Sequence, residues 1–107
     1  MNARPELYLT VSLDVEEEGL FGGQYARRGC TNTACLERLI PLCDVGVRPT
    51  LFCAHSVLAN PASLPILARL RDHCNAEIGA HLHHWNTPPL ALPGTPEPPD
   101  TAAAVPA

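Results

Sequence analysis

The chain has 107 residues, a formal net charge of −4, 46% hydrophobic and 17% charged residues. This length sets one globular domain as the upper bound. The arginines are scattered and lysine is absent, so nothing would neutralise a phosphate backbone and we expect no nucleic-acid binding. No apolar run reaches the roughly 18 residues of a membrane span, and the N-terminus lacks a secretory pattern. We therefore expect a cytoplasmic protein without membrane contact.

The five cysteines do not suggest a disulfide framework, because their number is odd and their spacing irregular. No C-x-x-C pair is present, which argues against a structural zinc knuckle. Three of them are predicted to be small core residues in a reducing compartment: Cys43, Cys53 and Cys74. Cys30 and Cys35 are close enough in sequence to reach each other.

The first predicted element is a strand from Leu7 to Val15, where apolar residues alternate with small or polar ones. The polar face ends at Asp14 and suits either a barrel interior or a solvated sheet face. A long glycine-containing loop, Glu16–Thr31, follows. It opens on an acidic run, Glu16–Glu18, of which two members are expected to be solvated.

A helix is predicted next, because four apolar residues recur at helical spacing: Leu36, Leu39, Ile40 and Cys43. Asn32 or Thr33 is its candidate N-cap. Pro41 should kink or shorten it, and Gly46 is the expected terminator.

The second half of the folded part predicts a short buried strand at Thr50–Ala54 and another at Ala76–Ala80. Between them, a helix is expected from Asn60-Pro61 to about His73, with Pro61 at its first position. Pro65 weakens that start, and Ile66, Leu67 and Leu70 form the apolar face. Strands that alternate with helices predict parallel pairing and an α/β architecture.

The character of the chain changes after Thr87, where seven prolines fall within a short stretch rich in alanine. We expect residues 5–87 to fold and residues 88–107 to form a disordered Pro/Ala-rich tail.

The candidate site starts from a histidine cluster, His81, His83 and His84, that follows the third predicted strand. Chemistry in parallel α/β folds gathers at the carboxyl ends of the strands. Asp14 lies at that end of the first strand, so the topology predicts that it meets His81. Glu16 shares a face with Asp14 in an extended segment, and His83 shares one with His81.

These residue types favour a metal-dependent hydrolase. A divalent ion held by imidazoles and a carboxylate can activate water, while a second carboxylate accepts the proton. His84 would point elsewhere unless the chain turns after Leu82. The plainer alternatives stay open: Asp14 as a loop cap, Glu16 as a solvated charge, and the histidines as structural groups. His55 is interpreted as structural, and Trp85 as a packing residue or the lining of a sugar-sized cleft.

Three segments resemble the N-terminal part of the polysaccharide deacetylases, the NodB-homology carbohydrate esterases. Ser12 to Glu17, S-L-D-V-E-E, resembles the family's T-F-D-D-G motif, and Pro49 to Cys53 is similar to its A-T-F-F strand. The most specific segment is Glu77 to Pro89, which resembles the H-[ST]-x-x-H motif and its surroundings. The likeness covers roughly residues 7 to 89.

The resemblance implies a distorted (β/α) barrel that hydrolyses N-acyl groups on sugars. It maps the catalytic base onto Asp14 and the metal ligands onto Glu16, His81 and His83, with zinc as the expected ion. Val15 stands at the usual second-aspartate position, so Glu16 takes that role through an aspartate-x-acid pattern. Trp85 stands where the family has its second histidine, and His83 is the substitute, with His84 behind it.

About three β-α units are present, whereas such a barrel needs on the order of 250 residues. The family's later motifs, including its general-acid histidine, have no counterpart. We therefore expect a partial barrel, truncated and catalytically incomplete, whose open edge invites self-association. Two alternatives remain. The first is a non-catalytic α/β chain, either a degenerate remnant or a module that completes its barrel with a partner. The second is a metal-dependent hydrolase of a small amide or cyclic imide.

Overall fold

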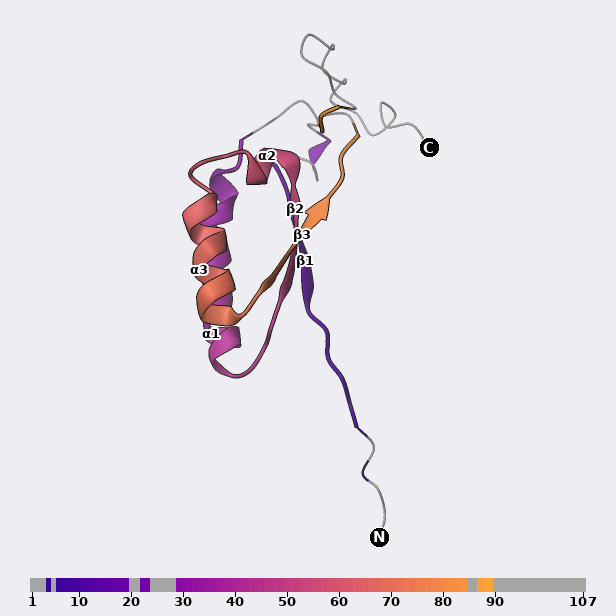
Figure 1. Cartoon of the computed structure of the whole chain (residues 1–107), viewed down its shortest axis with the longest axis vertical. Helices are drawn as coiled ribbons and strands as arrows, with labels where there is room; N and C mark the ends of the chain where they lie inside the picture. The colour runs from indigo at the N-terminus through magenta and orange to yellow at the C-terminus, as the bar shows by residue number, and fades with distance from the viewer. Residues whose placement is uncertain (1–3, 5, 20–21, 24–28, 85–86, 90–107) are drawn as a thin grey trace.

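The computed structural model of the chain describes residues 4, 6–19, 22–23, 29–84 and 87–89. The predicted α/β class is confirmed (Figure 1). In chain order, the elements are strand β1 (Ser12–Val15), the 3₁₀ helix η2 (Thr31–Leu39), helix α1 (Ile40–Asp44), strand β2 (Thr50–Ala54), helices α2 (His55–Leu58) and α3 (Leu64–Cys74), and strand β3 (Glu77–His81).

The three strands form a parallel sheet in the order β1-β2-β3. The parallel pairing was predicted from the alternation of strands and helices, whereas the order of the strands in the sheet was not. Phe52 of the central strand pairs with Asp14 on one side and with Gly79 on the other. Two residues further along β2, Ala54 pairs with His81. The sheet is open within the described residues, with β1 and β3 at its edges. Parallel pairing brings the carboxyl ends of all three strands to the same edge of the sheet.

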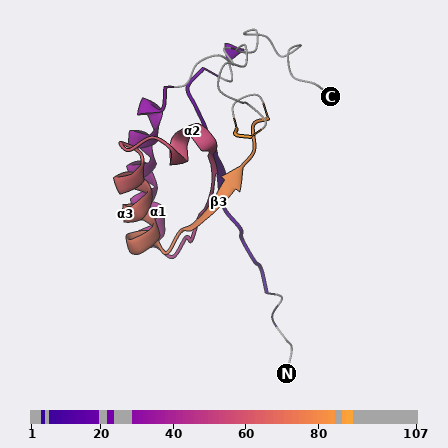
Figure 2. The same ribbon diagram turned by 45° about the horizontal axis from the view of Figure 1, so that its top comes forward.

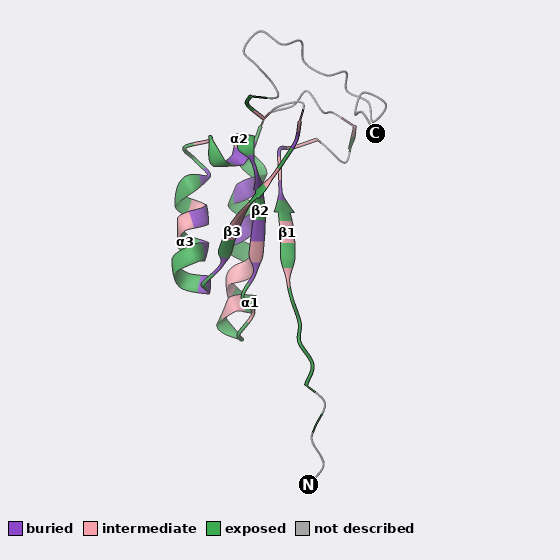
Figure 3. Ribbon diagram, turned by 45° about the vertical axis from the view of Figure 1, so that its right-hand side comes forward, coloured by how far each residue is buried: buried purple, intermediate pink, exposed green. Residues whose placement is uncertain are grey.

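The helices α1 and α3 pack on one side of this sheet (Figures 1 and 2). The core lies between the two layers, where burial is greatest along β2 and the inward sides of the helices (Figure 3). Leu51, Val57 and Leu70 are fully buried there. Cys53 and Cys74 are buried and Cys43 packs against the same cluster, so their prediction as core residues is confirmed. All five cysteines, including Cys30 and Cys35, are free thiols.

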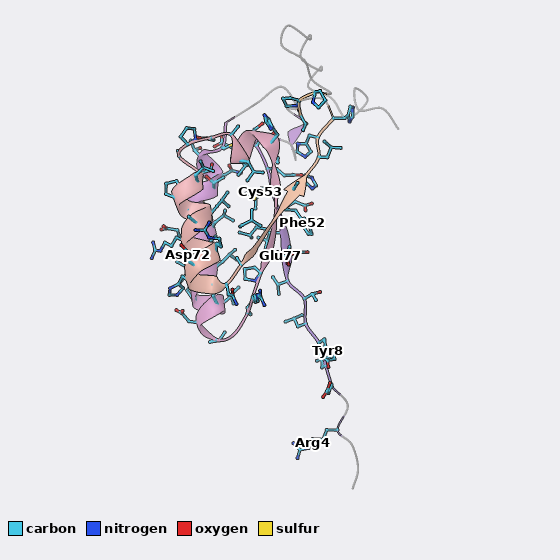
Figure 4. The ribbon with its side chains drawn as sticks, in the orientation of Figure 1. Arg4, Tyr8, Phe52, Cys53, Asp72 and Glu77 are labelled. Atoms are coloured by element: carbon cyan, nitrogen blue, oxygen red, sulfur yellow. The ribbon has the colours of Figure 1, made fainter. Side chains whose placement is uncertain are left out.

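The opposite face of the sheet is solvated. Side chains alternate along a strand, so Phe52 and Cys53, both labelled in Figure 4, point to opposite faces of β2. Phe52 is 37% exposed, and its ring lies so close to Gly79 that a Cβ there would be 3.1 Å from Cδ1. Asp14, its partner on β1, is exposed on the same face. The polar face is thus exposed in the described residues, which both of its interpretations allow.

The predicted strand from Leu7 to Val15 is too long. Only Ser12–Val15 forms β1, and Leu7 and Leu9 are 95% and 80% exposed. The reason is the partner: β1 lies at the sheet edge, and its only neighbour, β2, begins at Thr50, which pairs with Ser12. Alternation predicts a strand wherever it continues, but a strand needs a second chain segment for its hydrogen bonds.

The first helix has the predicted apolar face but a different backbone. Residues Thr31–Leu39 are 3₁₀, and α-helical geometry covers only Ile40–Asp44. Pro41 lacks an N–H and lies in the first turn of α1, and Ile40 N–H bonds three residues back to Glu37 O. Pro41 therefore shortens the α-helix, as predicted.

The two ends of this helical segment test the predicted N-cap and the predicted terminator. The N-cap position belongs to Cys30, with no side-chain cap bond, so the expected caps at Asn32 or Thr33 are wrong. At the other end, Gly46 has a φ of +101° and donates its N–H to Cys43 O at 3.0 Å. Glycine adopts this φ without steric cost, which confirms the predicted terminator.

The second helix starts later than predicted. Helix α3 begins at Leu64 instead of Pro61, because Pro65 has no N–H and is tolerated only in a first turn. Its buried residues Leu67 and Leu70 match the predicted apolar face. The one-turn helix α2, directly after β2, was not anticipated. None of the described helices is long and apolar enough to traverse a bilayer, and the predicted tail lies outside the described residues beyond Pro89.

Candidate metal centre

Three predicted ligands come together at the carboxyl edge of the sheet. Glu16 follows β1, His81 ends β3, and His83 lies two residues further along. Glu16 Oε1 lies 2.6 Å from His81 Nε2 and 3.0 Å from His83 Nε2. The two imidazole rings meet edge to face, with centroids 4.8 Å apart and an interplanar angle of 82°. One carboxylate oxygen thus lies between two imidazole nitrogens.

This donor set fits a divalent metal ion. One ligand atom from each of Glu16, His81 and His83 can be chosen so that all three lie within 4.8 Å of one another. Zinc bonds of roughly 2.0–2.2 Å in tetrahedral geometry hold neighbouring ligand atoms about 3.4 Å apart. The observed Glu16–histidine separations are slightly shorter, so small side-chain rotations would admit an ion. Two imidazoles and a carboxylate are also a typical three-residue set for a catalytic zinc.

Asp14 lies next to these three residues without belonging to the group. Its Oδ1 is 3.7 Å from His81 Nδ1, on the other side of the ring from Glu16. Its side chain is 58% exposed, whereas that of Glu16 is 16% exposed. The two carboxylates that the sequence analysis paired therefore occupy different environments, one open to solvent and one enclosed by histidines.

Glu17 is the residue that sequence reasoning missed. Its side chain is fully buried, although two of the three acidic residues were expected to be solvated. Glu17 Oε2 lies 3.2 Å from His83 Nδ1, and Ser56 Oγ of helix α2 donates to Glu17 Oε1 at 2.6 Å. A signal was available in the sequence: Ser56 lies two residues after the carboxyl end of β2, beside His55, which was interpreted as structural.

The third member of the acidic run, Glu18, is partly exposed but has partners of its own. Glu18 accepts hydrogen bonds from the Asn32 N–H at 3.2 Å and from the Thr31 hydroxyl. It thereby satisfies one backbone N–H group, that of Asn32, at the start of η2, which is the role expected of a helix cap. Three consecutive glutamates thus have three different sets of partners: alternation separates Glu16 from Glu17, and the chain turns at Glu18.

The electrostatics of the pair formed by Glu17 and His83 are dominated by burial and mutual contact. Burial by itself would raise the pKa of Glu17, but the contact with His83 and the Ser56 hydrogen bond outweigh it and lower that pKa to about 2. For His83, burial would lower the pKa, yet Glu17 and Glu16 outweigh it and raise the pKa above its usual value. Both groups are therefore held in their charged forms when no metal is present.

These opposite shifts predict a pH window for the stability of the metal-free chain. Glu17 contributes stability above its unfolded value of 4.5, and this is lost as pH falls toward about 2. His83 contributes below its unfolded value of 6.5, and this is lost as pH rises through its higher folded value. The contribution of the pair is therefore largest between about pH 4.5 and 6.5.

Urea unfolding of the chelator-treated chain across this range is the measurement. Glu17→Gln should remove most of the pH dependence between pH 4.5 and 2. A wild-type profile that stays flat from pH 6 down to pH 2 would contradict the assignment.

The remaining candidates lie outside the group. His84 is half-buried and is not one of the three candidate ligands among the described residues. His55 opens α2 and is exposed, although it was interpreted as structural. Trp85, which stands at the family's second-histidine position, lies outside the described residues.

Comparisons with known proteins add no name to this geometry: family models, characterised proteins and solved structures give no match to the chain. What the fold and the site define is a three-stranded parallel α/β unit with a candidate Glu-His-His metal centre at the carboxyl edge of its sheet.

Proposed function

We propose that this chain carries the metal-binding part of a hydrolase that removes N-acyl groups from carbohydrates. The observation that carries the proposal is the convergence of Glu16, His81 and His83, with Asp14 beside them. The segments that resemble polysaccharide deacetylases meet at this place: Ser12–Glu17 supplies both carboxylates, and Glu77–Pro89 supplies both histidines. In this proposal, the parallel sheet is part of a (β/α) barrel whose interior is the solvated face.

The residues divide the work in the following way. Glu16, His81 and His83 would hold the ion, for which zinc is the proposal because imidazole suits it. When bound, such an ion polarises an acyl carbonyl and lowers the pKa of water. Asp14, exposed beside His81, is placed to accept a proton as general base. The Phe52 ring, exposed on the same sheet face as Asp14, offers an apolar surface to one side of a sugar ring.

Acetate release from N-acetylated chito-oligosaccharides by the zinc-supplied chain tests this proposal. Asp14→Asn should lower the rate by about 10²–10⁴-fold, the usual range for a general base, while zinc content stays unchanged. Glu6→Gln is the matched control, because that exposed carboxylate lies far from the site in the extended N-terminal segment. Faster hydrolysis of simple amides or cyclic imides than of acetylated sugars would favour the small-amide alternative.

A second candidate is a non-catalytic α/β module that completes its sheet with a second copy of the chain. The observation in its favour is an apolar groove of about 360 Å³ to which Ile78 of the edge strand β3 contributes. It is lined by Leu58, Leu64, Leu67, Ala68, Arg71 and Ile78. This candidate expects bound zinc without acetate release, and a dimer in analytical ultracentrifugation that Ile78→Glu dissociates.

A further inference from the structure

We propose that Glu17 and Ser56 form a positioning pair that fixes the tautomer of His83, with the proton on Nδ1 and Nε2 turned toward Glu16 and His81. The effect of this pair on metal affinity rests on the proposed metal centre. The tautomer of His83 does not depend on that centre, since it is a property of the metal-free chain. Neither residue is a candidate ligand, because Glu17 contacts the ring nitrogen opposite to the one facing Glu16.

The first step of the argument is the direction of the ring. His83 is 4% exposed, and its two nitrogens face two different carboxylates, Glu17 at Nδ1 and Glu16 at Nε2. A neutral imidazole carries one proton, so only one of these contacts can keep a donor. The ring nitrogen that keeps the proton donates to its carboxylate, and the other nitrogen is left with a free lone pair.

The second step compares the two carboxylates. Glu17 is fully buried and has lost its hydration, so a missing donor there leaves a buried charge poorly compensated. Glu16 is less enclosed and has a second imidazole, His81 Nε2, at 2.6 Å. Loss of the proton from Nδ1, the nitrogen that faces Glu17, therefore costs more free energy than loss from Nε2. The neutral ring accordingly keeps its proton on Nδ1.

The third step is the anchor of Glu17 itself. Ser56 lies in the one-turn helix α2, which follows the central strand directly, and its hydroxyl donates to Glu17 Oε1. The carboxylate of Glu17, which itself lies in the loop after β1, is thereby anchored to the helix that directly follows the buried central strand. Metal-ligating histidines generally donate their other N–H to a carboxylate, and loss of that partner costs about 10–100-fold in metal affinity.

Ring-¹⁵N NMR of the histidine-labelled, metal-free chain at alkaline pH tests the tautomer directly. The wild-type chain should show His83 with its proton on Nδ1, whereas Glu17→Ala should shift the proton to Nε2, where Glu16 remains as acceptor. Glu17→Gln keeps the size of the side chain and guards against a variant that does not fold; it should populate both tautomers. Wild-type His83 with its proton on Nε2, or a tautomer unchanged in Glu17→Ala, would overturn the proposal.

Zinc competition with a chromophoric chelator supplies the second readout. Affinity should fall about 10–100-fold in Glu17→Gln, by less in Ser56→Ala, and hardly at all in Glu18→Gln. Glu18 is the matched control, because it is the adjacent carboxylate and bonds to Thr31 and Asn32 rather than to a histidine. Equal losses in Glu17→Gln and Glu18→Gln would overturn the positioning role. A wild-type chain that binds no zinc would instead remove the proposed function, while the NMR result still decides the tautomer.

Discussion

His81→Ala is expected to lower zinc affinity by at least about 100-fold, beyond the 10–100-fold typical of residues that only orient a ligand. The reason is direct participation: His81 offers one of only three candidate ligand atoms in the described part of the chain. Glu16 and His83 alone would leave a two-ligand site, which is insufficient for the three protein ligands that a catalytic zinc usually has. Equilibrium dialysis with metal analysis measures the effect.

His73→Ala is the matched control for this prediction. His73 is also a histidine on the surface of the fold, but it pairs with Asp44 at 2.9 Å on the exposed side of α3. Its substitution should leave zinc content unchanged. Equal zinc content in wild type and His81→Ala would show that the ion binds elsewhere, and the proposed centre would then be wrong.

Leu51→Ala is expected to lower the free energy of unfolding by about 2–5 kcal/mol, the range for removing a buried leucine from a core. Leu51 is fully buried in the central strand β2, whose side chains pack against α1 and α3. A chain of this length has a total stability of only about 5–10 kcal/mol. The substitution should therefore remove a substantial part of that stability and lower the urea concentration at the unfolding midpoint.

Urea unfolding followed by circular dichroism measures this difference. Leu7→Ala is the control, because Leu7 is 95% exposed in the N-terminal segment and its truncation removes no core contact. We expect a change of less than about 0.5 kcal/mol for it. A loss below 1 kcal/mol in Leu51→Ala would mean that the sheet and helix layers do not pack as described.

Local pattern predicted the elements well wherever the residues themselves enforce the geometry. Thr50–Ala54 is a strand as predicted, and Gly46 ends the first helical segment because its positive φ suits glycine. The errors at element boundaries arose where residues outside the local pattern decide the structure. Leu7–Val11 alternates as a strand does, but β2 begins opposite Ser12, and its first residue, Thr50, donates its N–H to Val11 O. Pro61 is a good first helical residue, yet Pro65 moved the start of α3.

The candidate site shows the same division. The strand-end rule placed Asp14 and His81 at one edge, and the structure brings them within 3.7 Å. Glu16 and His83 also lie where the spacing predicted. The rule did not indicate Glu17, because an acidic residue in a loop is usually solvated and its burial depends on what covers it.

By itself, the sequence determined the α/β class and the parallel pairing of the strands, and it indicated Glu16, His81 and His83 as candidate ligands, since periodicity and residue chemistry are local properties. Only the tertiary structure decided which of three consecutive glutamates faces the histidines, which is buried beneath them and which caps a helix. Burial and pairing depend on segments up to 67 residues apart, as between Glu16 and His83, and no local pattern encodes that separation.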